Sequence, residues 1–269
     1  MKTRPRLFAA WLAALTSTAA LLITSVALAA DVHVMISAGF FQAYSALAPG
    51  FERASGHKLV TTRGPSLGDS PEAIPNRIKR GEPVDVVIAV GASIDDLGHQ
   101  GMLSAGSKVN LARSEIGMVV RAGAPTPDIG SVDAFRRTLL DAKSIAYSDS
   151  ASGIYLSTTL FAKLGVADQV MGKARKIRGP PSGEQVATVV ARGEAEIGFQ
   201  QVSELIDVPG VSFVGTIPAE LQQETYFSAA IATAVKEREA AGALIRYLAS
   251  PEAAPAISKA GLTPVAAGR

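Results

Sequence analysis

The chain has 269 residues and no cysteine, and its 26 Lys and Arg residues slightly outnumber its 24 Asp and Glu residues. The lack of cysteine excludes disulfides, cysteine-ligated metal sites and thiol nucleophiles. A formal net charge of +2, with no basic stripe that carries interleaved aromatic residues, argues against nucleic acid as a partner.

Residues 1–30 have the pattern of a secretory signal peptide. Basic residues precede a long apolar run, which ends in the A-x-A pattern of Ala27, Leu28 and Ala29. The run is also long enough to anchor the chain in a membrane. The cleavage-site residues lie directly before a strand-like segment, and this order favours a leader that is removed after Ala29 or Ala30. We therefore expect a periplasmic protein that has no membrane segment after cleavage.

Strand-like and helix-like segments alternate through the rest of the chain. Runs of β-branched residues predict strands, and apolar residues at helical spacing predict helices. This alternation predicts α/β lobes with mostly parallel sheets, in which ligands bind beyond the carboxyl ends of the strands. The expected strands are 32–38, 58–63, 84–90, 144–148, 196–202, 211–217 and 226–235, and the expected helices are 41–56, 73–83, 93–103, 132–142, 156–165, 185–195 and two within 238–261.

The segment SDSASGIY, residues 148–155, joins an expected strand to an expected helix. Small and hydroxyl residues at the start of a helix leave several backbone N–H groups free to bind an anion. The serines could also act only as helix N-caps. Their number, beside Gly153 and Tyr155, favours an anion site.

Five segments form a pattern in chain order: VMISAGFFQAYSALAPGFERASGHKL, NRIKRGEPVDVVIAVG, SASGIYLSTTLFAKLG, GEQVATVVARGEAEIGF and ALIRYLASPEAAPAISKAGL. Together they resemble the periplasmic molybdate-binding proteins of ABC transporters. The resemblance implies a two-lobed type II periplasmic binding fold, with mostly parallel sheets flanked by helices and a ligand cleft between the lobes. Lobe 1 is then expected at 31–113 and 229–269, and lobe 2 at 114–228. The chain is expected to cross between the lobes near 111–116 and 225–229.

The expected ligand loops differ from those that the resemblance implies for a molybdate site. Gly39, beside Phe40, stands where the family carries a serine that donates to the oxyanion. Tyr155 matches a family tyrosine, but Gln200 or Gln201 stands in place of a later one. A compact cage of neutral donors suits a tetrahedral oxyanion, so these changes argue against molybdate.

The loop after the second strand supplies Arg63, Ser66 and Ser70, and Arg178 lies in a later loop. Arginine forms planar bidentate pairs with carboxylates, so these residues favour a small organic polycarboxylate. Arg63 and Arg178 could also be surface residues, and Phe40 could belong to the core. The expected ligand-binding residues are Gly39, Phe40, Arg63, Ser66, Ser70, Ser150, Ser152, Gly153, Tyr155, Arg178, Gln200 and Gln201.

Two functions from different classes fit this site. The first is a monomeric solute-binding protein that captures a small organic anion for an ABC permease and needs no cofactor. The second is an isomerase, since periplasmic aconitate isomerase is similar to the molybdate-binding proteins and interconverts trans- and cis-aconitate by allylic proton transfer.

An isomerase needs a base and groups that hold the charge which develops on the substrate. The candidate bases near the expected cleft are Glu72, Asp149 and Glu184. Glu72 and Glu184 lie in the first turns of expected helices, where acidic residues are also common for electrostatic reasons alone. The three histidines lack a partner at metal-ligand spacing, so no metal is expected.

Overall fold

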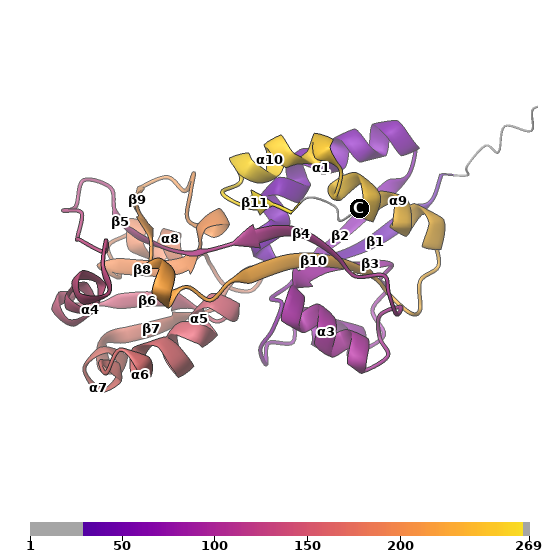
Figure 1. Cartoon of the computed structure of the whole chain (residues 1–269). Coiled ribbons are helices and arrows are strands. Elements are labelled where there is room, and N and C mark those ends of the chain that lie inside the picture. Colours follow the sequence, from indigo (N-terminus) through magenta and orange to yellow (C-terminus); the bar gives the residue numbers. More distant parts are fainter. Residues whose placement is uncertain (1–28, 266–269) are drawn as a thin grey trace, which may run out of the picture.

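The computed structural model describes residues 29–265, so the expected signal peptide lies almost entirely outside the described residues. The chain forms two α/β lobes, each built on its own sheet, and two crossings connect them (Figure 1). Within residues 29–265, no helix is both long and apolar enough to cross a bilayer.

Lobe 1 is built on a six-stranded sheet. Its strands, in sheet order, are β11 (Thr263–Pro264), β4 (Val109–Ser114), β10 (Thr225–Ile231), β3 (Val86–Val90), β1 (Asp31–Ile36) and β2 (Lys58–Arg63). Its helices are α1 (Ala38–Ser55), α2 (Ile74–Lys79), α3 (Gly91–His99), α9 (Arg238–Leu248), the 3-10 turn η5 (Pro251–Ala253) and α10 (Ala254–Lys259). The helices α1, α9 and α10 cover one face of the sheet, and α3 covers the other (Figure 1).

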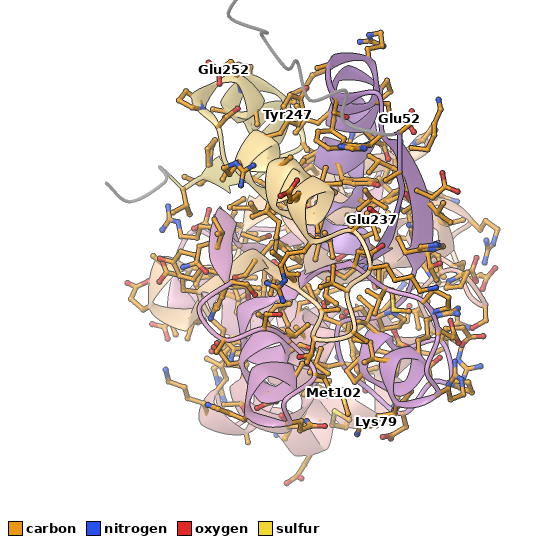
Figure 2. The ribbon with its side chains drawn as sticks, turned by 90° about the vertical axis from the view of Figure 1, so that its right-hand side faces the viewer. Glu52, Lys79, Met102, Glu237, Tyr247 and Glu252 are labelled. Atoms are coloured by element: carbon orange, nitrogen blue, oxygen red, sulfur yellow. The ribbon has the colours of Figure 1, made fainter. Side chains whose placement is uncertain are left out.

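The apolar residues of α1 explain why this helix packs against the sheet of lobe 1. Its residues Phe40, Tyr44, Leu47 and Phe51 recur at helical spacing and are all buried against the sheet. Tyr247 of α9 packs on Phe51 with ring centroids 5.7 Å apart, and Figure 2 looks onto this side of lobe 1. The long apolar stripe holds the first residues of α1 firmly at the end of β1.

Lobe 2 is built on a five-stranded sheet. Its strands, in sheet order, are β7 (Ala174–Ile177), β6 (Ile145–Ser148), β8 (Ile197–Gln201), β5 (Ile116–Arg121) and β9 (Val211–Thr216). Its helices and helical turns are α4 (Val132–Asp141), α5 (Ala151–Tyr155), the π-helical η1 (Leu156–Leu160), α6 (Phe161–Lys163), α7 (Ala167–Val170), η2 (Met171–Lys173), α8 (Val186–Ala191), η3 (Val202–Glu204) and η4 (Ala219–Leu221). The residues of α8 pack in one core cluster, and those of α4, α6 and α7 pack in another.

The crossings between the lobes are short. Glu115 alone separates β4 from β5. On the return path, the side-chain amide of Gln222 accepts from the Ile116 N–H and donates to the Ile116 carbonyl, both at 2.9 Å. This pair fastens the return segment to the start of β5 just before β10 begins.

The sheets are mixed rather than mostly parallel. The strand β1 runs parallel to β2 and β3, and β6 runs parallel to β7 and β8, but β10 and β5 are antiparallel to their neighbours. The crossing strands are antiparallel because the chain leaves lobe 1 along β4 and returns to it along β10.

Four strands, β4, β5, β7 and β11, were not among those expected from the sequence, and β7 has the clearest physical reason. The strand β7 contains Arg175 and Lys176, which resemble a loop when they are taken alone. It forms the edge of its sheet, and both side chains are exposed there. Charged residues are typical of edge strands, since they discourage pairing with other chains.

Candidate functional site

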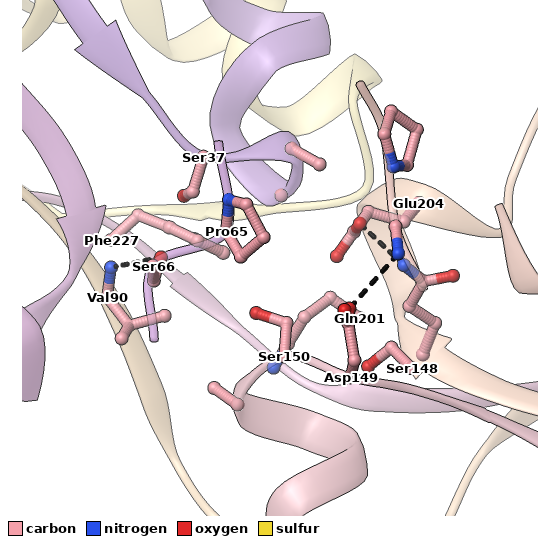
Figure 3. Close-up of a pocket in the computed structure, with 16 residues that line it drawn as sticks. Ser37, Pro65, Ser66, Val90, Ser148, Asp149, Ser150, Gln201, Glu204 and Phe227 are labelled. Atoms are coloured by element: carbon pink, nitrogen blue, oxygen red, sulfur yellow. Dashed lines mark hydrogen bonds between the residues drawn. The ribbon is translucent and has the colours of Figure 1, made fainter. Parts of the chain in front are cut away.

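A small pocket lies between the lobes, at the ends of β1, β3, β6 and β8 (Figure 3). Its volume is about 30 Å³, enough for on the order of one or two water molecules. The lining residues come from both lobes, as expected for a ligand cleft in such a fold. They are Ser37, Ala38, Gly39, Pro65, Ser66, Val90 and Phe227 of lobe 1, and Ser148, Asp149, Ser150, Ala151, Gly179, Pro180, Gln200, Gln201 and Glu204 of lobe 2.

The start of α1 forms one wall of the pocket. The hydroxyl of Ser37 is buried and has no hydrogen-bond partner in the part of the chain that the structure describes. Gly39 packs so closely on Phe227 that a Cβ at this position would overlap the aromatic ring. Because Gly39 has no side chain, the first turn of α1 can lie against Phe227 in the wall of the pocket. The N–H groups of this turn have no partner within the helix.

Glu204 is the buried acidic residue of the pocket. Its Oε1 accepts a hydrogen bond of 2.6 Å from Nε2 of Gln200. Burial raises the pKa of Glu204 to about 7, because the charged form has lost its hydration. The hydrogen bond from Gln200 and the positive charge of Arg63 oppose this effect, and the negative charge of Asp149 adds to it.

The two glutamines at the end of β8 have different surroundings. Gln200 accepts the Val186 N–H through Oε1 at 3.2 Å and donates to Glu204. Gln200 or Gln201 was expected to donate to the ligand, and the structure directs the donation of Gln200 to Glu204 instead. Gln201 reaches Thr225 Oγ1 at 3.4 Å, and its own Oε1 is buried without a hydrogen-bond partner among residues 29–265. Gln201 is therefore the glutamine with an unused polar atom.

The turn after β6 supplies a third wall. Asp149 accepts the Gly179 N–H through Oδ1 at 3.1 Å, and Ser150 lies beside it at the start of α5 (Figure 3). Ser152 is buried behind this wall, where its hydroxyl lies 3.1 Å from that of Ser148. A Cβ on Gly153 would overlap the Ser148 carbonyl, so this glycine lets α5 pack against the end of β6.

Several expected ligand-binding residues have other contacts. Phe40 is fully buried in the core of lobe 1. Ser66 lines the pocket, but its hydroxyl accepts the Val90 N–H at 3.1 Å. Tyr155 donates to the Leu221 carbonyl at 2.9 Å and lines a neighbouring groove rather than the pocket itself.

The two expected arginines differ in exposure. The Arg63 guanidinium lies 4.0 Å from the centroid of the Phe41 ring and is half-buried, and its Nε has no partner in the described chain. Arg178 is exposed and lies near Glu72. Neither side chain lines the small pocket.

Two of the three expected bases, Glu72 and Glu184, do not line the pocket, which argues against their prediction as bases, whereas the third, Asp149, does line it. Glu72 binds the hydroxyls of Ser70 and Ser182, and the bond from Ser70 is the main reason why the pKa of Glu72 is lowered. Glu184 forms a bidentate ion pair with Arg192 at 2.6 and 2.9 Å, which lowers its pKa. Both carboxylates are ionised surface groups, whereas a base needs a higher pKa.

Sequence reasoning missed Glu204 and Ser37. The available signal for Glu204 was an acidic residue two positions after an expected strand end, between the apolar residues Val202 and Leu205, which are both buried. Within residues 29–265, no cluster of His, Asp and Glu side chains could hold a metal ion.

The chain is similar to bacterial solute-binding proteins over almost all of its described length. A family model described as bacterial extracellular solute-binding protein matches residues 32–263. The aconitate isomerase of a Pseudomonas species is 49% identical over 234 residues, which cover 87% of this chain and 88% of that protein. The molybdate-binding protein ModA of Azotobacter vinelandii is 29% identical over 244 residues, which cover 89% and 92%.

A solved structure supports the fold independently of these sequence matches. The periplasmic molybdate-binding protein of Azotobacter vinelandii superposes with a TM-score of 0.68 at 21% identity, and the match covers 86% of this chain and 98% of that one. The expected two-lobed periplasmic binding fold and the resemblance to molybdate-binding proteins are thereby confirmed. The chain belongs to the bacterial extracellular solute-binding protein family.

Proposed function

We propose that this protein is a periplasmic isomerase that moves a proton along the allylic system of a small tricarboxylate, as in the interconversion of trans- and cis-aconitate. The observation that carries the proposal is Glu204, a buried carboxyl group in the wall of the pocket between the lobes. The 49% identity to an aconitate isomerase supports the same reaction.

The chemistry explains why such a group is needed. The reaction removes a proton from a methylene carbon and returns one at the other end of the allylic system. A carboxyl group whose pKa is near 7 can both accept and donate a proton at neutral pH. We assign this role to Glu204 rather than to Glu72 or Glu184, which lie outside the pocket. Asp149 lines the pocket, and its Oδ1 already accepts the Gly179 N–H.

The surroundings of Glu204 suit a substrate with several negative charges. Backbone N–H groups at the start of α1 and the hydroxyls of Ser37 and Ser150 can bind carboxylates without adding charge. Arg63 supplies positive charge close to Glu204. The same donors can hold the negative charge that develops on the substrate when the proton leaves.

The substrate is larger than the pocket, so the lobes must separate to admit it. Contacts across the cleft hold them together in this structure. Ser203 Oγ donates to the Gly39 carbonyl at 2.6 Å, Ser182 Oγ donates to Glu72 at 3.2 Å, and Gln42 Nε2 donates to Asp207 at 3.4 Å. These three polar contacts are of the kind that hinge closure makes and breaks.

A second candidate function is a receptor that delivers a small organic anion to an ABC permease. The family of this chain and the molybdate-binding relatives favour it. In that case Glu204 binds the ligand in its protonated form, as a hydrogen-bond donor. Affinity then falls as the pH rises through 7, whereas the kcat of an isomerase rises with the ionised base.

The test is proton NMR of the leaderless protein with trans-aconitate, alongside the variants Glu204→Gln and Glu220→Gln. Glu220 is an exposed carboxylate on η4, so it controls for the substitution itself. We expect the cis isomer to form with the wild type and with Glu220→Gln, and not with Glu204→Gln. Broadened ligand signals without conversion would favour the receptor, and full activity of Glu204→Gln would refute the assignment of the base.

A further inference from the structure

The buried amide of Gln200 joins the start of α8 to the acidic group of the pocket. We propose that Gln200 is a positioning residue that holds the Glu204 carboxyl group by one oxygen and leaves the other free for the substrate. The proposal rests on the isomerase function proposed above and adds to it a residue whose effect is exerted through Glu204.

The orientation of the Gln200 amide follows from its two contacts. Its Oε1 accepts the N–H of Val186, the first residue of α8, at 3.2 Å. N–H groups at the start of a helix have no partner within the helix. A flipped amide would place its NH2 group against this N–H and its oxygen against Glu204, so both contacts would be lost. The Val186 N–H therefore directs Nε2 toward Glu204.

The contact divides the two oxygens of Glu204 between different roles. Oε1 accepts the 2.6 Å hydrogen bond from Gln200. No hydrogen bond to Oε2 is present in the described part of the chain, and Glu204 lines the pocket. Gln200 and Val186 are both almost fully buried, so this arrangement is rigid. Rigid placement of the reacting oxygen is a condition for efficient proton transfer.

The neutral side chain of Gln200 is also compatible with a raised pKa of Glu204. The charged groups that act on this carboxyl group are Arg63 and Asp149. A second cation in place of Gln200 would hold Glu204 permanently ionised and too weak as a base. A neutral amide donor favours the ionised form only in part, and so leaves burial as the dominant effect.

Two substitutions separate positioning from packing. Gln200→Glu keeps an acceptor for the Val186 N–H but replaces the donor that faces Glu204. Gln200→Met keeps the length of the side chain and removes both polar contacts. Gln169→Glu, at an exposed position of α7, is the matched control for the first substitution.

The experiment measures kcat and KM for trans-aconitate from pH 5 to pH 9. Difference infrared spectroscopy follows the protonation of Glu204, identified by the band that Glu204→Gln lacks. Without its donor, ionised Glu204 is less stable, so the Gln200→Met titration should move up by about one pH unit. The shifted titration alone should lower its kcat about fivefold at pH 7. A further loss of kcat that persists at pH 9, with little change in KM, measures the lost positioning of Glu204.

The outcomes distinguish this inference from the isomerase function. An unchanged infrared titration in both Gln200 variants overturns the inference, and so does a kcat that equals that of the wild type at every pH. A shifted titration in a protein whose wild type produces no cis-aconitate supports the contact between Gln200 and Glu204 and refutes the isomerase. A shift that also occurs in Gln169→Glu overturns the inference, because that residue is exposed and distant in sequence.

Discussion

The two lobes contribute different chemistry to one pocket. Lobe 1 contributes uncharged groups, namely the start of α1 with Ser37 and Gly39, the bound hydroxyl of Ser66 and the ring of Phe227. Lobe 2 contributes Asp149, the two glutamines of β8 and Glu204. Lobe 2 also contributes the hydroxyl of Ser150, so the comparison indicates that both lobes offer uncharged donors to an anion, whereas the acidic groups lie in lobe 2 alone. A change in one lobe can then alter the reaction without rebuilding the fold.

The largest effect is expected from a substitution that disturbs the packing of α5 against the end of β6 in lobe 2. A Cβ on Gly153 would overlap the Ser148 carbonyl, and this backbone cannot move without displacing β6. We expect Gly153→Val to lower the free energy of unfolding by about 3 kcal/mol, the upper range for overpacking. Chemical denaturation measures this loss. Gly172→Ala, where a Cβ meets nothing, is the control. Selective loss of ligand binding with normal stability would instead show that the glycine serves the ligand.

The second prediction concerns the unfolding free energy that is lost because the ionised carboxylate of Glu204 is buried. Its folded pKa of about 7 exceeds the ordinary value of 4.5, so the folded state binds more protons between these pH values. The unfolding free energy therefore falls as the pH rises through this window. Glu204→Gln should be more stable than the wild type by about 3 kcal/mol at pH 8 and nearly equal to it at pH 4. Thermal unfolding across this range tests the prediction, and a difference that does not depend on pH would contradict it.

Arg63 tests whether lobe 1 also supplies charge. If this half-buried guanidinium assists the substrate carboxylates, Arg63→Ala should weaken binding at least tenfold, since a hydrogen bond to a charged group contributes about 1.5–3 kcal/mol. Calorimetric titration with trans-aconitate measures the change. Arg178→Ala is the matched control, because that side chain is exposed and should change the affinity little. Equal effects of the two substitutions would mean that only the general charge of the protein matters.

The smallest effect is expected at Glu184. Its carboxylate is ion-paired with Arg192 on the surface, and such pairs contribute little. Glu184→Gln should leave kcat and KM for trans-aconitate within about twofold of the wild type, because exposed ion pairs are screened by water and salt. A large loss of kcat would restore Glu184 as a candidate base and contradict the assignment of the base to Glu204.

The sequence indicated the fold well because the strand and helix patterns are regular and lie in family order. It also indicated four parts of the pocket, namely Gly39, Ser66, the turn after β6 and the glutamines of β8, since strand ends meet at one edge of a sheet. It did not indicate Glu204, because burial in a 3-10 turn depends on contacts with the other lobe, such as that between Ser203 and Gly39. Phe40 lies in the core rather than the pocket because the rotation of α1 places it on the apolar stripe.

The bond between Ser203 and Gly39 has a consequence for the timing of the reaction. Ser203 and Glu204 lie on the same short turn, η3. A movement that separates the lobes and breaks the bond between Ser203 and Gly39 would therefore also expose the carboxyl group of Glu204 to solvent. Water then reaches it, and its proton affinity falls toward that of any glutamate on a surface. For the proposed isomerase, Glu204 would therefore exchange its proton with the solvent in the open state and transfer a proton to carbon in the closed state.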